Sequence, residues 1–186
     1  MKGKRNSKGF TLIELLVTVA IILVIVAIAI PSYLSAKNAA NKSSGAATLR
    51  SINTSESLYQ SNCFGSFSST IVELGNGGGT LTPCTPFVGG ATPTKMTTGT
   101  LATLGDTALT SGSPATKGGY VFTYTPGAAD ATTGVISSWV ETAIPVTPGS
   151  GTQALCIDSS SNSIHASAVG TNTAGVATGA CTDPTL

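Results

Sequence analysis

The chain begins with a short polar stretch and then carries a long apolar segment. Residues 10–30 read FTLIELLVTVAIILVIVAIAI, and Glu14 is the one charged residue among them. As a helix this segment would extend about 32 Å, which is enough to cross the hydrocarbon layer of a membrane. The pattern therefore predicts a membrane-spanning helix over residues 10–31, with Pro31 at its end.

The helical pattern continues beyond Pro31. Residues 32–62 contain no further proline, and their apolar residues recur at helical spacing. The positions expected to share one packed face are Ala46, Leu49, Ile52, Glu56 and Tyr59. We expect one helix from Phe10 to about Asn62, because a proline is tolerated inside a membrane helix; a turn at the membrane exit is the alternative. Gly45 is the weak point, where the helix could unwind locally.

Turn residues and short strand patterns alternate through residues 63–186. Glycine and proline interrupt residues 63–112 too often for long helices, so this stretch predicts loops with short helices near 68–74 and 101–109. Aromatic and β-branched runs then predict four strands, over residues 119–125, 137–143, 153–158 and 163–167. Short strands in close succession form an antiparallel meander. The fold class expected is α+β, with the long helix packed on a small antiparallel sheet.

Composition and charge narrow the classes of function. Charged residues make up 9% of the chain, against roughly 25% in soluble domains, which argues against a cytosolic globular enzyme. Lys2, Lys4, Arg5 and Lys8 place four of the nine basic residues in residues 1–9. A basic leader before an apolar helix predicts a cytoplasmic amino terminus and an extracytoplasmic domain. Since no basic patch remains elsewhere, we expect no specific nucleic-acid partner.

The four cysteines all follow the apolar segment, as expected for disulfides in an oxidising compartment. They are Cys63, Cys84, Cys156 and Cys181, and they allow three connectivities, between which the sequence does not choose. Compact loops favour Cys63–Cys84 and Cys156–Cys181. No C-x₂-C spacing is present, so we expect no metal site and no cofactor.

Glu14 separates three interpretations of the first thirty residues. The first is a plain single-pass anchor, and the second is a cleaved secretory signal with a small-residue cleavage site at residues 27–29. Neither explains why a carboxylate lies within an apolar span. Cleavage between Gly9 and Phe10 would instead create an α-amine one helical turn from Glu14. That amine would neutralise the carboxylate within one chain, or set the register between two neighbouring helices.

The first 35 residues resemble the class III signal of type IV pilins and pseudopilins. The motif is Lys8-Gly9-Phe10-Thr11-Leu12-Ile13-Glu14-Leu15-Leu16, followed by the apolar run and Pro31. The resemblance implies that a prepilin peptidase cuts after Gly9 and methylates the amine of Phe10. It also implies that Glu14 aligns each subunit with the Phe10 amine of its neighbour, in an assembly segment that includes Thr11 and Pro31. The Cys156–Cys181 loop would correspond to the carboxy-terminal disulfide loop of many pilins.

These observations lead to an expected organisation and function. Residues 1–9 would be the leader, 10–31 the assembly helix, 32–62 its amphipathic continuation and 63–186 the outer domain. We expect a non-enzymatic subunit, held in the inner membrane and then polymerised through an assembly platform with identical or related subunits. The product would be a surface filament for adhesion, twitching motility or DNA uptake. A pseudopilin of type II secretion, with a periplasmic filament, is the closest alternative.

Two alternatives from other classes remain on the sequence alone. One is a membrane-anchored binding domain that never polymerises, and the other is a secreted hydrolase. The hydrolase has no support from a nucleophile–base pair, and His165 lies in no catalytic motif, so we expect an ordinary strand or surface residue there.

Overall fold

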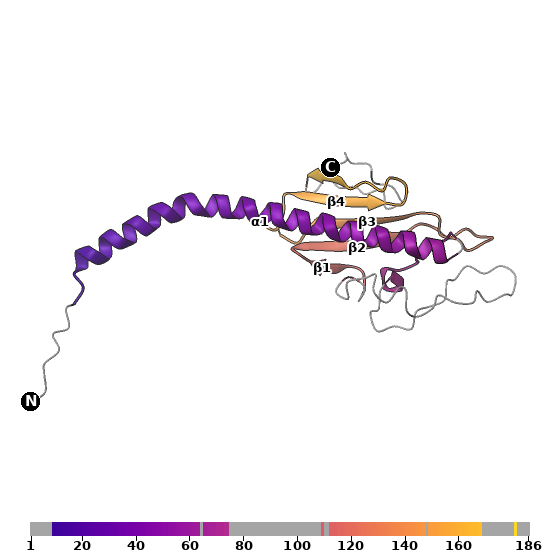
Figure 1. The fold of residues 1–186 in the computed structure, drawn as a ribbon, viewed down its shortest axis with the longest axis horizontal. Coiled ribbons are helices and arrows are strands. Elements are labelled where there is room, and N and C mark those ends of the chain that lie inside the picture. The colour runs from indigo at the N-terminus through magenta and orange to yellow at the C-terminus, as the bar shows by residue number, and fades with distance from the viewer. Residues whose placement is uncertain are drawn as a thin grey trace, which may run out of the picture. The chain divides into compact units, whose positions relative to one another are not determined.

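The computed structural model describes residues 9–63, 65–74, 109, 112–147, 149–168 and 181. The chain divides into two compact units, Met1–Lys37 and Asn38–Leu186, and each is described by itself. The helix α1, Leu12–Asn62, runs through both of them (Figure 1). The long helix expected from the sequence is therefore confirmed, with its first residue two positions later than predicted.

The described part of the first unit is the amino-terminal half of α1 and the residues that precede it. Every residue from Gly9 to Lys37 is exposed. Pro31 lies inside the helix, so the alternative of a turn at this position is wrong. A proline at this position has no N–H to donate to the carbonyl of Ala27, four residues earlier. A partner outside the helix is thus needed for that carbonyl wherever water is absent.

In the second unit, the carboxy-terminal half of α1 buries one face. The predicted packed face is confirmed, since its five residues, Ala46, Leu49, Ile52, Glu56 and Tyr59, are all buried. They recur every three or four residues, which is the spacing that brings side chains to one side of a helix. Arg50 and Ser57 lie between them in sequence and are exposed.

Gly45 does not unwind the helix, so that expectation is wrong. It is helical and buried, and a Cβ placed on it would lie 3.3 Å from Leu155 Cδ1 and 3.5 Å from Tyr120 Cδ2. The missing side chain lets the helix backbone approach the sheet closely. The physical reason for glycine here is packing, and helix propensity alone did not reveal it.

Within the described residues the sheet is a five-stranded antiparallel meander in the order β1-β2-β3-β4-β5. Its strands are β1 Ala115–Lys117, β2 Tyr120–Pro126, β3 Trp139–Pro145, β4 Gln153–Asp158 and β5 His165–Ala168. Four of them lie within two residues of the predicted strands, and His165 begins the last one as an ordinary strand residue. Figure 1 shows the second half of α1 running across β2 and β3.

The sequence analysis missed the strand β1. It has three residues, and Pro114 precedes it directly. Gly118 and Gly119 have φ values of 57° and 81°, and they join Lys117 to its register partner Tyr120 in a two-residue hairpin. Positive φ at both turn positions is what a type I′ hairpin requires, and Gly-Gly satisfies it. That dipeptide was the available signal for the extra strand.

The core of the second unit lies between α1 and one face of the sheet. Three alternate residues of β2 face this core, and each of the three is less than 9% exposed: Tyr120, Phe122 and Tyr124. Trp139 of β3, Leu155 and Ile157 of β4 belong to the same cluster. Such alternation buries every second residue of a strand, which explains the period-two pattern from which the strands were predicted.

The opposite face of the sheet carries the disulfide Cys156–Cys181, which is one of the two pairings favoured by the sequence. These cysteines form a small buried cluster with Val140. Cys63 is also disulfide-bonded, and Cys84, the partner expected for it, lies outside the described residues. A short 3-10 helix, η1, Ile71–Leu74, lies within the predicted helix at 68–74. The helix expected near 101–109 lies outside the described residues, except for Leu109.

Candidate assembly site

The residues expected to carry processing and assembly lie together at the start of α1. Gly9 and Phe10 precede the helix and have no helical assignment. Phe10 is 87% exposed, and a Cβ at Gly9 would meet nothing within 4 Å. The bond between them therefore lies in exposed chain, two residues before the helix begins.

Thr11 and Glu14 form a reciprocal cap at the first turn. The backbone N–H of Glu14 donates to Thr11 Oγ1 at 3.3 Å, and the backbone N–H of Thr11 donates to Glu14 Oε2 at 3.0 Å. The Thr11 hydroxyl also donates to Glu14 Oε2 at 2.8 Å. This is a capping box, which satisfies two backbone donors that a helix start leaves without partners.

The capping box gives Thr11 a defined role. The sequence analysis included Thr11 in the assembly segment without explaining it, although Thr-x-x-Glu before an apolar run is the signature of such a box. Both bonds to the Glu14 carboxylate end on Oε2. Oε1 is thus left open to a further donor, so far as the described residues show.

The helix that follows the cap exposes large apolar side chains on all sides. Phe10, Leu12 and Ile28 are the most exposed, and every large hydrophobic residue as far as Ile30 is at least 39% exposed. The apolar window of α1 has a mean hydropathy of 3.1, and none of it is buried within the chain. Within the described part of the chain, this is the one helix long and apolar enough to span a membrane. An apolar surface of this size on a protein needs lipid or another apolar surface to cover it.

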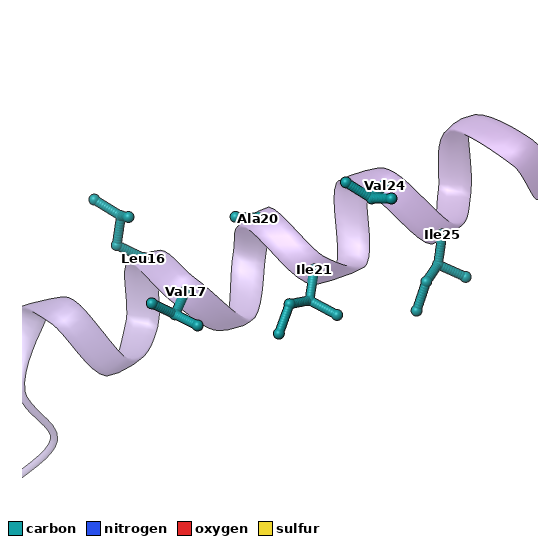
Figure 2. A pocket seen from close by; sticks show the side chains of 6 residues that line it. All are labelled: Leu16, Val17, Ala20, Ile21, Val24 and Ile25. Carbon is teal, nitrogen blue, oxygen red and sulfur yellow. The ribbon is translucent and has the colours of Figure 1, made fainter.

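Two regions of this surface have distinct shapes. Near the cap, Glu14 shares a surface with Phe10, Ile13, Val17 and Thr18, which is apolar around one carboxylate. One turn further along, a second region is wholly apolar, and Figure 2 shows its six side chains. They are Leu16, Val17, Ala20, Ile21, Val24 and Ile25. Ala20 has the smallest side chain of the six.

The other residues of the candidate set lie elsewhere. Pro31 lies in the same helix, five turns from the cap, and is exposed. The disulfide of Cys156 lies in the second unit, where Cys181 also donates its backbone N–H to Asp158 Oδ2 at 2.6 Å. These cysteines therefore stabilise the domain and take no part in the cap.

Comparisons with known proteins agree with an assembly site at the start of α1. Residues 4–30 match the family model of the prokaryotic N-terminal methylation motif. Over 73 residues the chain is 40% identical to the type IV wide pilus major component PilA4 of Thermus thermophilus. That match covers 38% of this chain and 56% of the relative, so the chain spans little more than half of the curated relative. No solved structure matches significantly.

The resemblance to type IV pilins is therefore confirmed, together with a pilin-like α+β fold. The matched motif contains Gly9, Phe10, Thr11 and Glu14, the same residues that the structure places at and just before the helix start.

Proposed function

We propose that this chain is the precursor of a structural pilin subunit. A prepilin peptidase cuts it between Gly9 and Phe10 and methylates the new amine, and the mature chain polymerises into a helical filament without catalysing a reaction of its own. The observation that carries the proposal is an uncovered apolar helix that starts with a Thr11–Glu14 cap directly after an exposed Gly9–Phe10 bond.

The local structure supports cleavage at this bond. A protease needs its substrate in extended form, and the helix begins only at Leu12. Gly9 presents no side chain on the leader side of the bond, so an enzyme can approach closely. The basic residues of the leader, Lys2 to Lys8, would hold it on the cytoplasmic side of the inner membrane.

The cap supports a register function for Glu14. After cleavage, the charged amine of Phe10 lies one residue before Thr11, at the helix terminus. An amine and a carboxylate 4 Å apart attract by about 4 kcal/mol at an effective dielectric constant of 20. Because Glu14 Oε2 already accepts from Thr11, Oε1 is the oxygen available to the amine of a neighbouring subunit. A neighbour that docks out of register would leave both charges unpaired in an apolar environment.

The apolar surface supports polymerisation after processing. Before assembly, lipid covers residues 10–30; in the filament, the same residues of identical or related subunits cover one another, and an inner-membrane assembly platform transfers them. The domain after residue 62 then forms the outer surface, where it serves adhesion, twitching motility or DNA uptake. The similarity to a major pilus component favours a surface pilus over the pseudopilus of a secretion system.

Mass spectrometry of the mature amino terminus tests the proposal. We expect a chain that begins with N-methyl-Phe10, recovered from sheared surface fibres. Gly9→Val should block processing because its branched side chain fills the space at the bond, whereas Gly3→Val, in the same leader, should be processed normally. An intact Met1 in native material would support the membrane anchor, and a start near Pro31 would support a secreted protein; either would overturn the proposal. A normal mature chain confined to the periplasm would indicate a pseudopilus instead.

The register function has a separate test. Glu14→Ala should be processed after Gly9 but should yield few filaments, measured as the sheared fraction of total mature subunit. Glu14→Gln keeps the size and the cap acceptor but removes the charge, so it should also assemble poorly. Asp130→Ala removes an exposed carboxylate of the domain and should assemble normally. Wild-type filament yields from both Glu14 variants would refute the amine–carboxylate pairing.

A further inference from the structure

Two glutamates lie fully buried between α1 and the sheet, and the assembly proposal uses neither of them. Glu56 projects from the packed face of α1, and Glu141 lies in the middle of β3; both are 0% exposed. In the β2–β3 register Glu141 is opposite Tyr124, and in the β3–β4 register it is opposite Ile157. Burying an ionised carboxylate costs several kcal/mol or more unless it is paired and hydrogen-bonded.

Glu56 has such partners. Its Oε1 accepts from the Tyr124 hydroxyl at 2.6 Å and from the Ser68 hydroxyl, while its Oε2 accepts from the Ser68 backbone N–H at 3.1 Å. Burial raises the pKa of Glu56, and the hydrogen bonds from Ser68 and Tyr124 act against that rise. The carboxylate thereby joins α1, the segment after Cys63 and β2 in one polar cluster.

Glu141 has none of this support. Both carboxylate oxygens are buried, and neither has a hydrogen-bond partner among the residues that the structure describes. Burial raises the pKa of Glu141 well above its usual range, and the charge of Glu56 raises it further. A neutral carboxylic acid costs much less to bury than its anion, so the protonated form is the one that fits this environment.

The described groups around Glu141 do not supply a positive charge. Tyr124 is a hydroxyl donor whose pKa is raised, first by burial and then by the charge of Glu56, so it stays neutral. Glu73 is a further acid near the cluster and accepts from the Tyr59 hydroxyl at 3.2 Å. The basic residue Lys117 of β1 is the register partner of Tyr120 on β2. Tyr120 lies four residues from Tyr124 on the same strand, which corresponds to about 13 Å.

We propose that Glu141 and Glu56 form a proton-holding pair between the helix and the sheet, which makes the domain a pH-sensitive device. The pair holds a proton in the folded domain, and Glu141 is the residue that carries it. As the pH rises, the unfolded chain releases this proton while the folded domain retains it, so folding becomes less favourable. The domain is thus stabilised by acid, and its helix–sheet contact weakens in alkali.

The size of the effect follows from proton linkage. Below the usual glutamate pKa of about 4.3, both states hold the proton, and the pair contributes no pH dependence. Above it, one proton more is bound in the folded state, so the unfolding equilibrium constant increases up to about tenfold per pH unit. The increase continues until the pH reaches the raised pKa of Glu141. If the domain lies outside the cytoplasm, as the proposed function requires, the pH of the surroundings acts on it directly.

Denaturant unfolding of the purified full chain in detergent micelles tests the proposal, independently of processing or filament formation. Trp139, the only tryptophan, stacks on Tyr124 with ring centroids 6.1 Å apart, so its fluorescence reports on this cluster. Between about pH 5 and pH 8 the wild type should lose stability as the pH rises, with a slope of up to about one proton as far as the raised pKa of Glu141. Glu141→Gln should lose most of that slope and should be the more stable of the two at the alkaline end.

Control variants distinguish the pair from other acids. Asp130→Asn removes an exposed carboxylate whose pKa is lowered by hydrogen bonds from Thr133 and Thr132, so it should keep the wild-type slope above about pH 5. Glu141→Met removes the ionisable group with an apolar side chain, in case the buried amide of Glu141→Gln prevents folding. Infrared spectra of the wild type at neutral pH should also show a protonated carboxylic acid. Stability independent of pH over this range, the wild-type slope in the Glu141 variants that fold, or a fully ionised spectrum would each overturn the proposal.

Discussion

Gly45 of α1 lies directly against Leu155 of β4, and even a Cβ between them would make a tight contact. A Cβ at Gly45 would be 3.3 Å from Leu155 Cδ1, closer than carbon atoms normally pack. The contact sets how near the helix backbone comes to the sheet. It lies at one end of the row of buried helix residues that continues through Leu49 and Ile52 to Tyr59.

Substitutions at Gly45 should therefore separate helix propensity from packing. Alanine gains about 1 kcal/mol of helix propensity and loses a similar amount where its Cβ meets Leu155, so Gly45→Ala should change the free energy of unfolding little. Gly45→Val adds two more methyl groups at the contact and should destabilise the domain by about 1–3 kcal/mol. Ala47→Val, at an exposed position of the same helix, carries the propensity cost of valine without the clash and should cost less than about 1 kcal/mol. Equal losses in the two valine variants, measured by urea unfolding, would contradict this account.

The cap at Thr11 should control the first turn of α1. Thr11→Ala removes the Oγ1 acceptor used by the Glu14 N–H and should weaken the helix start by about 0.5–2 kcal/mol. In detergent micelles, backbone amides of the first turn should then exchange with deuterium faster than in the wild type. Thr11→Ser retains the hydroxyl and should exchange at the wild-type rate. Unchanged protection in Thr11→Ala would show that the box does not hold the turn.

The Cys156–Cys181 disulfide should contribute through the unfolded chain. It closes a loop with a sequence separation of 25, for which chain entropy gives about 3 kcal/mol. The double variant Cys156→Ala with Cys181→Ala should therefore unfold at a lower urea concentration by an amount near this value. Adding a reductant should destabilise the wild type, and it should have a smaller effect on the double variant, in which only the disulfide of Cys63 remains. Equal effects of reductant on the two proteins would contradict the prediction.

Asp158 should make the domain sensitive to strong acid. Burial acts to raise the pKa of this carboxylate, but hydrogen bonds from the Cys181 N–H and from Ser160 and Ser161 outweigh it and lower the pKa. A folded pKa below the unfolded value of about 3.9 means that the stabilisation is present above that pH and is lost as the pH falls through the folded pKa. Asp158→Asn should thus cost about 1–3 kcal/mol near pH 7.

The cost of Asp158→Asn should shrink in strong acid, because the wild type loses the same contribution there. Urea unfolding at pH 7 and at about pH 3, followed by Trp139 fluorescence, measures the difference. A gap between wild type and variant that stays constant over this range would show that the charge of Asp158 is not responsible. The sign is opposite to that of Glu141, so these two carboxylates should together give a stability maximum at mildly acidic pH.

The parts of the fold that follow from local pattern were predictable from the sequence. The apolar run, the helical spacing of Leu49, Ile52 and Tyr59, and the alternation in β2 each reflect one face buried against one neighbour. The short strand β1 was missed because three residues carry little periodicity, although the Gly118-Gly119 turn next to it was visible. Gly45 was misjudged because its role depends on Leu155, 110 positions away in sequence.

The residues discussed for the candidate site and the buried pair also divide into those that the sequence predicts and those that only the structure reveals. Gly9, Phe10 and Glu14 were identified because the motif is local and fixes each residue type by spacing. The Thr11–Glu14 bonds were also encoded locally, in Thr-x-x-Glu, but only the structure assigned them. The burial of Glu141 was not predictable, since a charged residue in a strand ordinarily faces water; here both faces of β3 are covered, with Val140 and Glu141 each 0% exposed.

The order of the meander has a consequence for how the chain matures. Each of the first four strands pairs with the strand that comes next in the sequence, so the sheet is built from contacts of short sequence separation. Low contact order favours rapid folding, because only a short loop has to close, at a small cost in chain entropy, before each pair of strands forms. A chain tethered at one end by α1 can therefore complete its sheet strand by strand as it is synthesised. If the chain assembles as proposed, the domain can fold completely while the apolar helix is still in lipid.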